Sequence, residues 1–462
     1  MKNTRVLRVL GSIALGYAFC GSAFAITANP NMSLGKNLYV AGAVNSNWKP
    51  EVYTDGKLDF NQVASVSDFA LNVGEGPTKL FITWETRGDE SWASEEFVHA
   101  ASCQHSFAEG ATLKNFKVMT SANTTNGVDG DWETVAEVGE SGVTSRGLAI
   151  DFAGKFWFRI VAESPVKNLE EVGAYDISNG GDDTWFFMGT SISQMGMKQF
   201  TVDSNFAQLI HARFSDYYPA MLRGGIGCVT SQGVVDALKY YAEYAGNVKF
   251  WAIEMGTNDA WGGSNANVET FTKNLQTIID TAKAHGVTPI IARMIATNPE
   301  IAKWQVHQDY LDAIDKLTLD NELPKGPDFY SYFLEHPEEL STSDGVHPAE
   351  PKGGQSMHRL WAEAVAPLYK DDPCAGRPDV IGCGGTPLLK TRHVNFAMPR
   401  VSVNGRDISI SGLHENDRVT IMDAMGHVVW NGSAGIPKIP AGNYFVNVRG
   451  ANSNYSAKIS IK

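Results

Sequence analysis

Cysteine and basic residues are both scarce in this sequence. It has five cysteines in 462 residues, and no group of Cys and His residues has the spacing of metal ligands. We therefore expect neither a metal nor a cofactor. Lys and Arg number 38 against 51 Asp and Glu, which gives a formal net charge of −13. An acidic chain of this kind argues against nucleic acid as a partner and disfavours anionic membranes, but it is compatible with a neutral polymer or a small substrate.

Three further patterns are missing. Beyond the N-terminus no apolar run is long enough to span a bilayer, so we expect no membrane insertion. The motif Gly-x-Ser-x-Gly is absent, which argues against an ordinary α/β-hydrolase. The chain also has no low-complexity tract and no internal repeat, which argues against solenoids and arrays.

The first 25 residues have the pattern of a secretory signal peptide. A basic start is followed by an apolar stretch from Val9 to Phe19, and Ala23-Phe24-Ala25 fits the small-x-small rule for cleavage. We therefore expect a secreted protein. In an oxidising compartment, Cys374 and Cys383 flank a short Pro/Gly-rich loop and are expected to pair.

Residues 35–178 predict an all-β domain. Short alternating runs such as "KLFITWET" and "KFWFRIVAE" are separated by Gly, Asn and Asp, the spacing of a β-sandwich. The stretches "NFKVMTSANTTNGVDGDWETVAEV" and "LEEVGAYDIS" resemble the discoidin, galactose-binding-like jelly roll. That resemblance implies the fold, and it leaves open whether the domain binds carbohydrate.

Residues 182–370 change period and predict an α/β domain. The apolar runs "TWFFMG", "VKFWAIEMG" and "TPIIARM" alternate with helical patterns, which implies a parallel sheet covered on both faces. An apolar stripe predicts one helix from Val268 to Ala282, and a further helix is expected from Val202 to Phe214. Ligands bind beyond the carboxyl ends of the strands in such sheets.

The rest of the chain divides into a linker and a small β domain. Residues 371–395 are rich in Pro and Gly and predict a linker with the Cys374–Cys383 disulfide, whereas residues 396–462 are again β-like and predict a small β-sandwich. Its "IPAGNYFVNV" resembles the last hairpin of C-terminal sorting domains of type IX secretion substrates, which would imply cell-surface sorting. Cys103 and Cys228 lie in segments predicted to be different domains, so we expect both thiols to be free.

Four short motifs stand where parallel strands are expected to end. "GTSIS" contains Ser191, either a nucleophile or a turn residue, and "RGGIGCVTSQG" is a glycine-rich loop. "EMGTNDAW" carries Asn258, whose amide can donate to an oxyanion or close a turn. "STSDGVHPAE" carries Asp344 and His347 three residues apart, so that the carboxylate can hold the tautomer of the ring.

Taken in this order, the four motifs resemble the blocks of the SGNH (GDSL-like) hydrolases. The resemblance covers residues 184–370 and implies a flavodoxin-like α/β fold. It also implies that Ser191 is the nucleophile, that His347 is the general base and then acid, and that Asp344 orients His347. The oxyanion hole would comprise the N–H of Ser191, a backbone N–H of the second block and the amide of Asn258.

The sequence departs from the family pattern in two blocks. The first reads Gly-Thr-Ser rather than Gly-Asp-Ser, and the second lacks the usual Asn and has an extra glycine. The oxyanion donor of the second block is Gly227 in one register and Cys228 or Gly225 in others. All three are chemically acceptable, because the donor is a backbone N–H.

The resemblance extends to the kind of substrate. A signal peptide and a jelly roll in front of an SGNH domain look like the carbohydrate esterases that deacetylate plant cell-wall xylan, with acetylated polysaccharide or oligosaccharide as substrate. Trp261 would then line the substrate pocket or belong to the core. Two alternatives remain: a carbohydrate-binding or adhesion protein with an inactive hydrolase domain, and a secreted GDSL-type lipase or thioesterase.

Overall fold

The computed structural model describes residues 26–41, 49–57, 66–86, 90–93, 97, 110–140, 142–166, 168–198, 203–370, 400–411, 413, 417–423, 427–433, 436–450 and 453–461. It divides into two compact units, residues 1–383 and 384–462. The predicted signal peptide and the predicted 371–395 linker with its disulfide lie outside the described residues, so both stay predictions.

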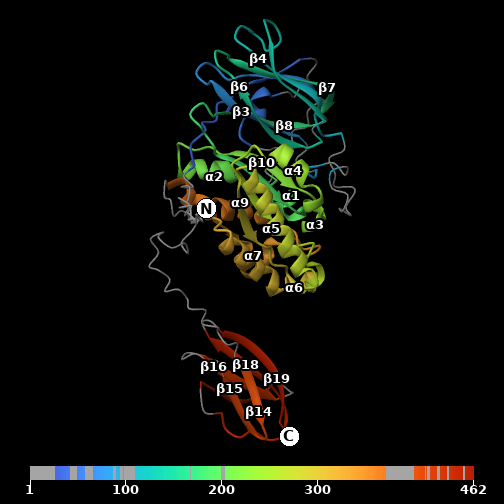
Figure 1. Cartoon of the computed structure of the whole chain (residues 1–462), viewed down its shortest axis with the longest axis vertical. Helices are drawn as coiled ribbons and strands as arrows, with labels where there is room; N and C mark the ends of the chain where they lie inside the picture. The colour runs from blue at the N-terminus through green and yellow to red at the C-terminus, as the bar shows by residue number, and fades with distance from the viewer. Residues whose placement is uncertain are drawn as a thin grey trace, which may run out of the picture. The chain divides into compact units, whose positions relative to one another are not determined.

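The first unit begins with a β-sandwich, drawn in blue to teal (Figure 1). Its strands are β1 Leu38–Val40, β2 Val66–Asn72, β3 Lys79–Thr86, β4 Lys114–Ser121, β5 Glu133–Glu140, β6 Ser145–Asp151, β7 Trp157–Val166 and β8 Leu169–Asp176. They form two antiparallel sheets, in the orders β1-β2-β7-β4-β5 and β6-β3-β8. One apolar cluster is shared by both sheets and includes Phe69, Phe158, Ile82 and Val172. The alternating apolar positions therefore face each other, as a sandwich requires.

The second part of this unit is a parallel sheet. Its strands are β9 Thr184–Gly189, β10 Ala220–Gly225, β11 Phe250–Glu254, β12 Thr288–Arg293 and β13 Lys325–Asp328. All neighbours are parallel, in the order β10-β9-β11-β12-β13. This is the 2-1-3-4-5 order of flavodoxin-like sheets. The prediction of a parallel α/β domain is confirmed, and the physical reason is visible in β9, β10 and β11, nearly all of whose side chains are buried.

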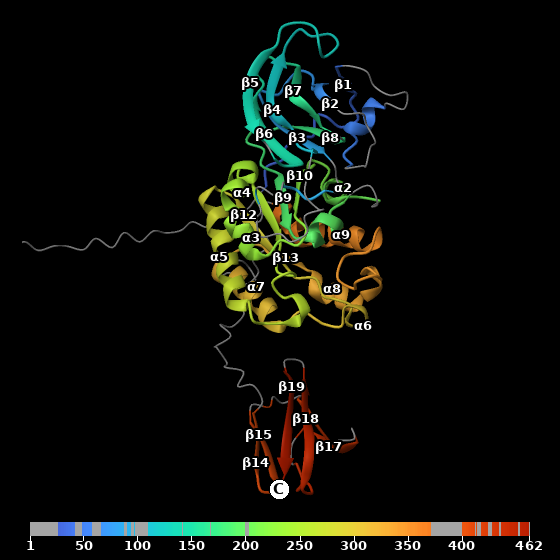
Figure 2. The same cartoon turned by 90° about the vertical axis from the view of Figure 1, so that its right-hand side faces the viewer.

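Helices cover both faces of this sheet (Figure 2). They are α1 Ser191–Gly196, α2 Phe206–Arg213, α3 Ser231–Asp236, α4 Leu238–Ala245, α5 Val268–Ala284, α6 Pro299–Ala302, α7 Gln308–Asp320, α8 Phe329–Glu335 and α9 Lys352–Val365. Among the described residues, short 3-10 turns are η1 Pro50–Tyr53 in the sandwich part, and η4 Trp261–Gly263, η5 Pro337–Glu339 and η6 Ala366–Lys370 in the α/β part. One apolar cluster joins α3, α4, α5 and α7 to one face, and a second joins α1, α2, α8 and α9 to the other.

The predicted helices agree with the observed ones to different degrees. The stripe that predicts a helix from Val268 is confirmed by α5, whose predicted inward residues are buried from Phe271 onward. The helix expected from Val202 begins only at Phe206, because the side chain of Asn205 accepts a hydrogen bond from the Gln208 N–H and caps it. Helix α1 was not expected, since six residues are too few to show a period.

The sandwich and the α/β domain pack directly against each other. The N–H of Trp92 donates to the carbonyl of Gly225 at the end of β10, at 2.9 Å. The Trp92 ring lies 4.7 Å from the ring of Phe186 and 4.9 Å from that of Tyr241, centroid to centroid. The segment around Trp92 therefore contributes to the core of the α/β domain.

Cys228 corrects one expectation. It is disulfide-bonded, so the prediction of a free thiol is wrong for this residue. Its partner is one of the other four cysteines, all of which lie outside the described residues. The prediction treated the two domains as separate, but the sandwich reaches the loop after β10, where Cys228 lies.

The second unit is antiparallel throughout its described residues. Its strands are β14 Arg400–Asn404, β15 Asp407–Ser411, β16 Arg418–Asp423, β17 Val428–Gly432, β18 Gly442–Gly450 and β19 Ser453–Ile461. They form a β14-β15 pair and a β17-β16-β18-β19 sheet. Ile408 from the pair and Val419, Val446 and Ile459 from the sheet belong to one buried cluster.

Over the part of the chain that the structure describes, none of the helices has both the length and the apolar character needed to cross a membrane.

Candidate active site

The carboxyl edge of the sheet places Ser191. Gly189, Gly225 and Glu254 end the three neighbouring strands in register. Thr190 follows β9 and caps α1, because its Oγ1 accepts the Ile192 N–H at 3.1 Å. Ser191 is therefore the first residue of α1, where helical geometry leaves a backbone N–H without an intrahelical acceptor.

Three predicted residues form one chain of hydrogen bonds. Nε2 of His347 lies 2.8 Å from Oγ of Ser191, and Nδ1 of His347 lies 3.0 Å from Oδ2 of Asp344. A carboxylate only accepts hydrogen bonds, so Nδ1 carries the proton and Nε2 faces the serine as an acceptor. The Ser191 side chain can therefore pass its proton to His347.

The loop from Ser341 to Pro348 keeps Asp344 ionised. Oδ1 of Asp344 accepts the N–H groups of Val346 and His347, at 2.7 and 3.0 Å. Burial acts to raise the pKa of Asp344, but these N–H donors and the His347 ring outweigh it, so the pKa lies below its usual value. Gly345 is required here, because its φ is +67° and a Cβ would come within 2.9 Å of Ile301.

Asn258, which the sequence predicts as an oxyanion donor, lies in the turn after β11. Its Nδ2 donates to the carbonyl of Val229 at 2.8 Å. A side-chain amide has two N–H bonds, so one fixes the side chain against the glycine-rich loop and the second remains for an oxyanion. The neighbouring Asp259 accepts the N–H and hydroxyl of Ser231 and so ties this turn to the start of α3.

The three candidate oxyanion donors of the glycine-rich loop, Gly225, Gly227 and Cys228, differ in the contacts and conformation of their backbone. The N–H of Gly227 donates to Oγ of Ser91, from the sandwich, at 3.0 Å. Gly225 is the last residue of β10, and its carbonyl accepts the Trp92 N–H. Cys228 has a φ of +60°, a conformation that glycine adopts more readily. The sequence could not anticipate the Ser91 contact, because Ser91 is 136 residues away.

The structure separates the two serines of "GTSIS". Ser193 is buried, and its hydroxyl donates to Oε2 of Glu254 at 3.2 Å, so it faces the interior rather than His347. Ser191 alone of the two meets the imidazole. Glu254 is a site residue that the sequence analysis missed, since a carboxyl group at the end of an apolar strand has no motif that identifies it.

Trp261 belongs to an aromatic pair at the surface. Its side chain is 54% exposed, and its ring centroid lies 5.3 Å from that of Trp304. The turn after Trp261 abuts the same segment, because a Cβ at Gly263 would come within 2.9 Å of the Gln305 carbonyl. Of the two readings of Trp261, pocket or core, exposure argues against the core.

The segment that carries Trp304 also contacts the loop of His347. The N–H of Asn298 donates to the carbonyl of Gly345 at 2.7 Å, and Ile301 packs against Gly345. Residues 297–305 therefore connect the turn after Asn258 with the loop of His347. Trp304 thus belongs to a segment that contacts both parts of the site.

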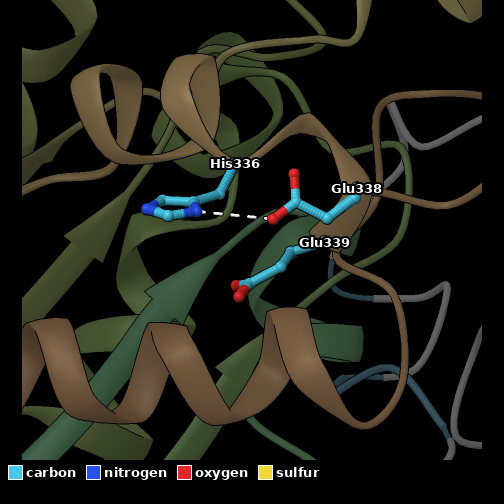
Figure 3. Close-up of side chains that lie close together, drawn as sticks. All are labelled: His336, Glu338 and Glu339. Atoms are coloured by element: carbon cyan, nitrogen blue, oxygen red, sulfur yellow. Dashed lines mark hydrogen bonds and ion pairs between the residues drawn. The ribbon is translucent and has the colours of Figure 1, made fainter.

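One other group of side chains has a composition suited to metal binding. His336, Glu338 and Glu339 each offer a ligand atom, all within 4.8 Å of one another (Figure 3). Nδ1 of His336 lies 3.4 Å from Glu338, and the Glu339 carboxylate accepts the Tyr332 hydroxyl at 3.2 Å. All three belong to the turn around η5, and of the three only Glu338 is exposed. Within the described part of the chain, no hydrogen bond or ion pair joins their side chains to Ser191, His347 or Asp344. We assign no function to this group.

Comparisons with known proteins add little to this geometry. The sequence matches no protein-family model, and no curated protein matches it. A lipase/acylhydrolase from Enterococcus faecalis is 18% identical over 39% of this chain and 94% of its own, with a TM-score of 0.33. A Bacillus subtilis protein is 13% identical over 65% of this chain and 80% of its own, with a TM-score of 0.35. An acetylxylan esterase from Geobacillus stearothermophilus is 15% identical over 40% of this chain and 94% of its own, with a TM-score of 0.30.

Similarities this distant say nothing about the activity of this chain, whereas the geometry of the site does. Fold and site define a class of arrangement: a parallel α/β domain whose carboxyl edge holds a Ser–His–Asp chain of hydrogen bonds beside backbone and amide donors. This arrangement can activate a serine hydroxyl and stabilise a developing oxyanion.

Proposed function

We propose that the protein is a secreted serine esterase that removes acetyl groups from plant cell-wall polysaccharide, with acetylated xylan as its substrate. The observation that carries the esterase activity is the 2.8 Å contact between Oγ of Ser191 and Nε2 of His347, with Asp344 behind the ring. A serine held this way is an activated nucleophile.

The proposed reaction is acyl transfer to water. Ser191 attacks the ester carbonyl while His347 takes its proton, and Asp344 stabilises the imidazolium that forms. The tetrahedral oxyanion accepts hydrogen bonds from the Ser191 N–H, the Asn258 amide and an N–H of the glycine-rich loop. His347 then protonates the leaving alcohol. Water, deprotonated by the same imidazole, hydrolyses the acyl-enzyme.

Three features support a polysaccharide substrate. The exposed Trp261, whose ring packs against the partly buried Trp304, offers flat apolar surface of the kind on which a sugar ring stacks. The acidic chain suits a neutral polymer, and the predicted signal peptide suits an extracellular one. The second unit would serve cell-surface sorting after export.

The test is acetate release from acetylated xylan by the mature protein and by Ser191→Ala. We expect release by the wild type and, for Ser191→Ala, a loss of at least about 1000-fold in turnover, because removing a triad member leaves only the oxyanion hole and binding. A cooperative unfolding transition like that of the wild type would show that the variant is folded. Mass spectrometry of a phenylmethanesulfonyl-labelled wild type should place the label on Ser191 rather than Ser193.

Other outcomes distinguish the alternatives. Activity on p-nitrophenyl acetate without acetate release from xylan would keep the esterase and reject the polymer. A preference for long-chain p-nitrophenyl esters would favour the lipase or thioesterase. Absence of both activities and of serine labelling, together with retention on insoluble xylan, would favour the binding protein with an inactive hydrolase domain.

A further inference from the structure

Glu254 lies directly behind the turn that carries Ser191. It is the last residue of β11, is fully buried, and pairs in register with Gly189 at the end of β9. Its Oε2 accepts three hydrogen bonds: from the Thr190 N–H at 3.2 Å, from the Thr190 hydroxyl at 3.0 Å and from the Ser193 hydroxyl at 3.2 Å. One carboxyl oxygen thus holds the residues on both sides of Ser191.

These contacts fix the first turn of α1 relative to the sheet. Oγ1 of Thr190 accepts the Ile192 N–H, so its own proton is free to go to Glu254. Gly189 lets the turn approach the strand, because a Cβ there would come within 2.1 Å of the Ser193 hydroxyl. A shift of Ser191 would therefore disturb the contacts that Thr190, just before it, and Ser193, two residues after it, make with Glu254.

We propose that Glu254 is the positioning residue of the nucleophile: through Thr190 and Ser193 it holds the Ser191 hydroxyl at bonding distance from His347. This rests on the proposed serine chemistry and adds a residue to it. Glu254 acts through its neighbours and does not touch the substrate.

The chemistry of Glu254 explains which substitutions it should tolerate. Burial raises the pKa of Glu254, and the bonds from Thr190 and Ser193 act against that rise. Its Oε1 is buried and has no hydrogen-bond partner among the described residues. Glutamine keeps an acceptor oxygen for the three donors at nearly the same volume, whereas alanine leaves all three donors unsatisfied.

The same contacts account for threonine at position 190. A carboxylate side chain there would lie about 3 Å from Oε2 of Glu254, where Thr190 Oγ1 lies now. Two buried carboxylates at that distance cannot both ionise, so one would have to take up a proton or the turn would have to move. Thr190 and Glu254 are thus a matched pair.

Kinetics on p-nitrophenyl acetate test the positioning role. We expect Glu254→Ala to lower kcat about 100-fold with KM changed less than about threefold, since a displacement near 1 Å costs about that much in rate. Glu254→Gln should keep kcat within about fivefold of the wild type. A folded Glu254→Ala with kcat within about threefold of the wild type would overturn the proposal, and so would a folded Glu254→Gln as inactive as Glu254→Ala.

Thr190 variants keep the test decisive if Glu254→Ala fails to fold. Thr190→Val removes the hydroxyl at equal volume and should lower kcat at least about tenfold, whereas the matched control Thr190→Ser should retain it. Thr190→Asp should lower kcat about 100-fold. Adding Glu254→Gln to this variant should raise kcat at least about tenfold again, because the amide of the glutamine can donate a hydrogen bond to the new carboxylate. If Thr190→Val, or Thr190→Asp alone, kept the kcat of the wild type, Thr190 and Glu254 would not be a matched pair.

Two readouts separate this inference from the proposed function. The rate at which phenylmethanesulfonyl fluoride labels Ser191 should fall in Glu254→Ala in parallel with kcat, whatever the natural substrate is. A crystal structure of Glu254→Ala should show the Ser191 Oγ to His347 Nε2 distance lengthened beyond about 3.5 Å, the limit of a hydrogen bond. An unchanged 2.8 Å contact would overturn the positioning role even if the natural substrate were never found.

Discussion

At the scale of single residues, the site depends on which atom of each side chain is already engaged. Asn258 illustrates this, because its Nδ2 donates to the Val229 carbonyl at 2.8 Å. The contact orients the amide so that its remaining N–H is available. Gly227 illustrates the opposite case. Its single N–H already donates to Oγ of Ser91, so that N–H is not available to an oxyanion.

Asn258→Ala measures the contribution of the amide. We expect turnover on p-nitrophenyl acetate to fall by about 100- to 1000-fold, the usual effect of losing one oxyanion donor. The Val229 contact is lost as well, so the free energy of unfolding should fall by about 1 kcal/mol. Asn258→Asp is the control for side-chain shape. It keeps the volume of the side chain but has no N–H to donate, so its turnover should be at least as low as that of Asn258→Ala. A loss in Asn258→Ala of under about threefold would remove Asn258 from the oxyanion hole.

At the scale of elements, a buried carboxyl group at the start of β9 makes stability depend on pH. Asp183 is fully buried, accepts hydrogen bonds from the Trp185 indole at 2.8 Å and the Tyr369 hydroxyl at 2.9 Å, and leaves Oδ2 without a partner among the described residues. Burial raises the pKa of Asp183 from 3.8 to about 7. Between those two pH values the folded protein holds a proton that the unfolded chain has released, so this group lowers stability as pH rises towards 7.

Asp183→Asn should remove this dependence. The amide oxygen can accept both existing hydrogen bonds, and no buried charge forms at high pH. We expect the variant to gain stability relative to the wild type at pH 8 and much less at pH 5, with a difference on the order of a few kcal/mol. Urea unfolding of both proteins at the two pH values measures it. An equal difference at pH 5 and pH 8 would show that Asp183 does not titrate in this range.

Elements also show what the period of a sequence can and cannot predict. Helix α5 was predicted because its 17 residues repeat an apolar stripe, and the fully apolar strands predicted the parallel sheet. The six residues of α1 contain less than two turns and carry no such signal. The cap at Thr190, which starts that helix, depends on a side-chain contact rather than on a period.

At the scale of the whole molecule, the β-sandwich takes part in the site of the α/β domain. Ser91 accepts the Gly227 N–H at 3.0 Å, and its hydroxyl lies 3.1 Å from Oε1 of Gln194 in α1. Arg223 of β10 pairs with Glu85 of β3 at 2.6 Å, and both side chains are less than a tenth exposed. The glycine-rich loop and the helix of Ser191 are thus tied to each other through a residue of the sandwich.

Ser91→Ala tests that dependence. We expect kcat on p-nitrophenyl acetate to fall about tenfold, because the Gly227 N–H loses a buried acceptor and the loop loses its tie to α1. Ser178→Ala is the matched control, since among the described residues its hydroxyl forms hydrogen bonds only with Thr78, Lys79 and Asp176, none of which belongs to the α/β domain. Equal kcat in the two variants would show that the sandwich packs against the α/β domain without contributing to activity through Ser91.

What the sequence determined by itself follows from local pattern and from side-chain chemistry. Alternation at period two indicated the β domains, apolar strands between helices indicated the parallel sheet, and Asp344 and His347 could be paired because they are three residues apart. Only the tertiary structure decided that Glu254 holds the turn around Ser191, that Ser91 occupies the Gly227 N–H and that Cys228 is disulfide-bonded. The reason is physical: Glu254 is 64 residues from Thr190, and Ser91 is 136 from Gly227, so these contacts exist only once the chain has packed.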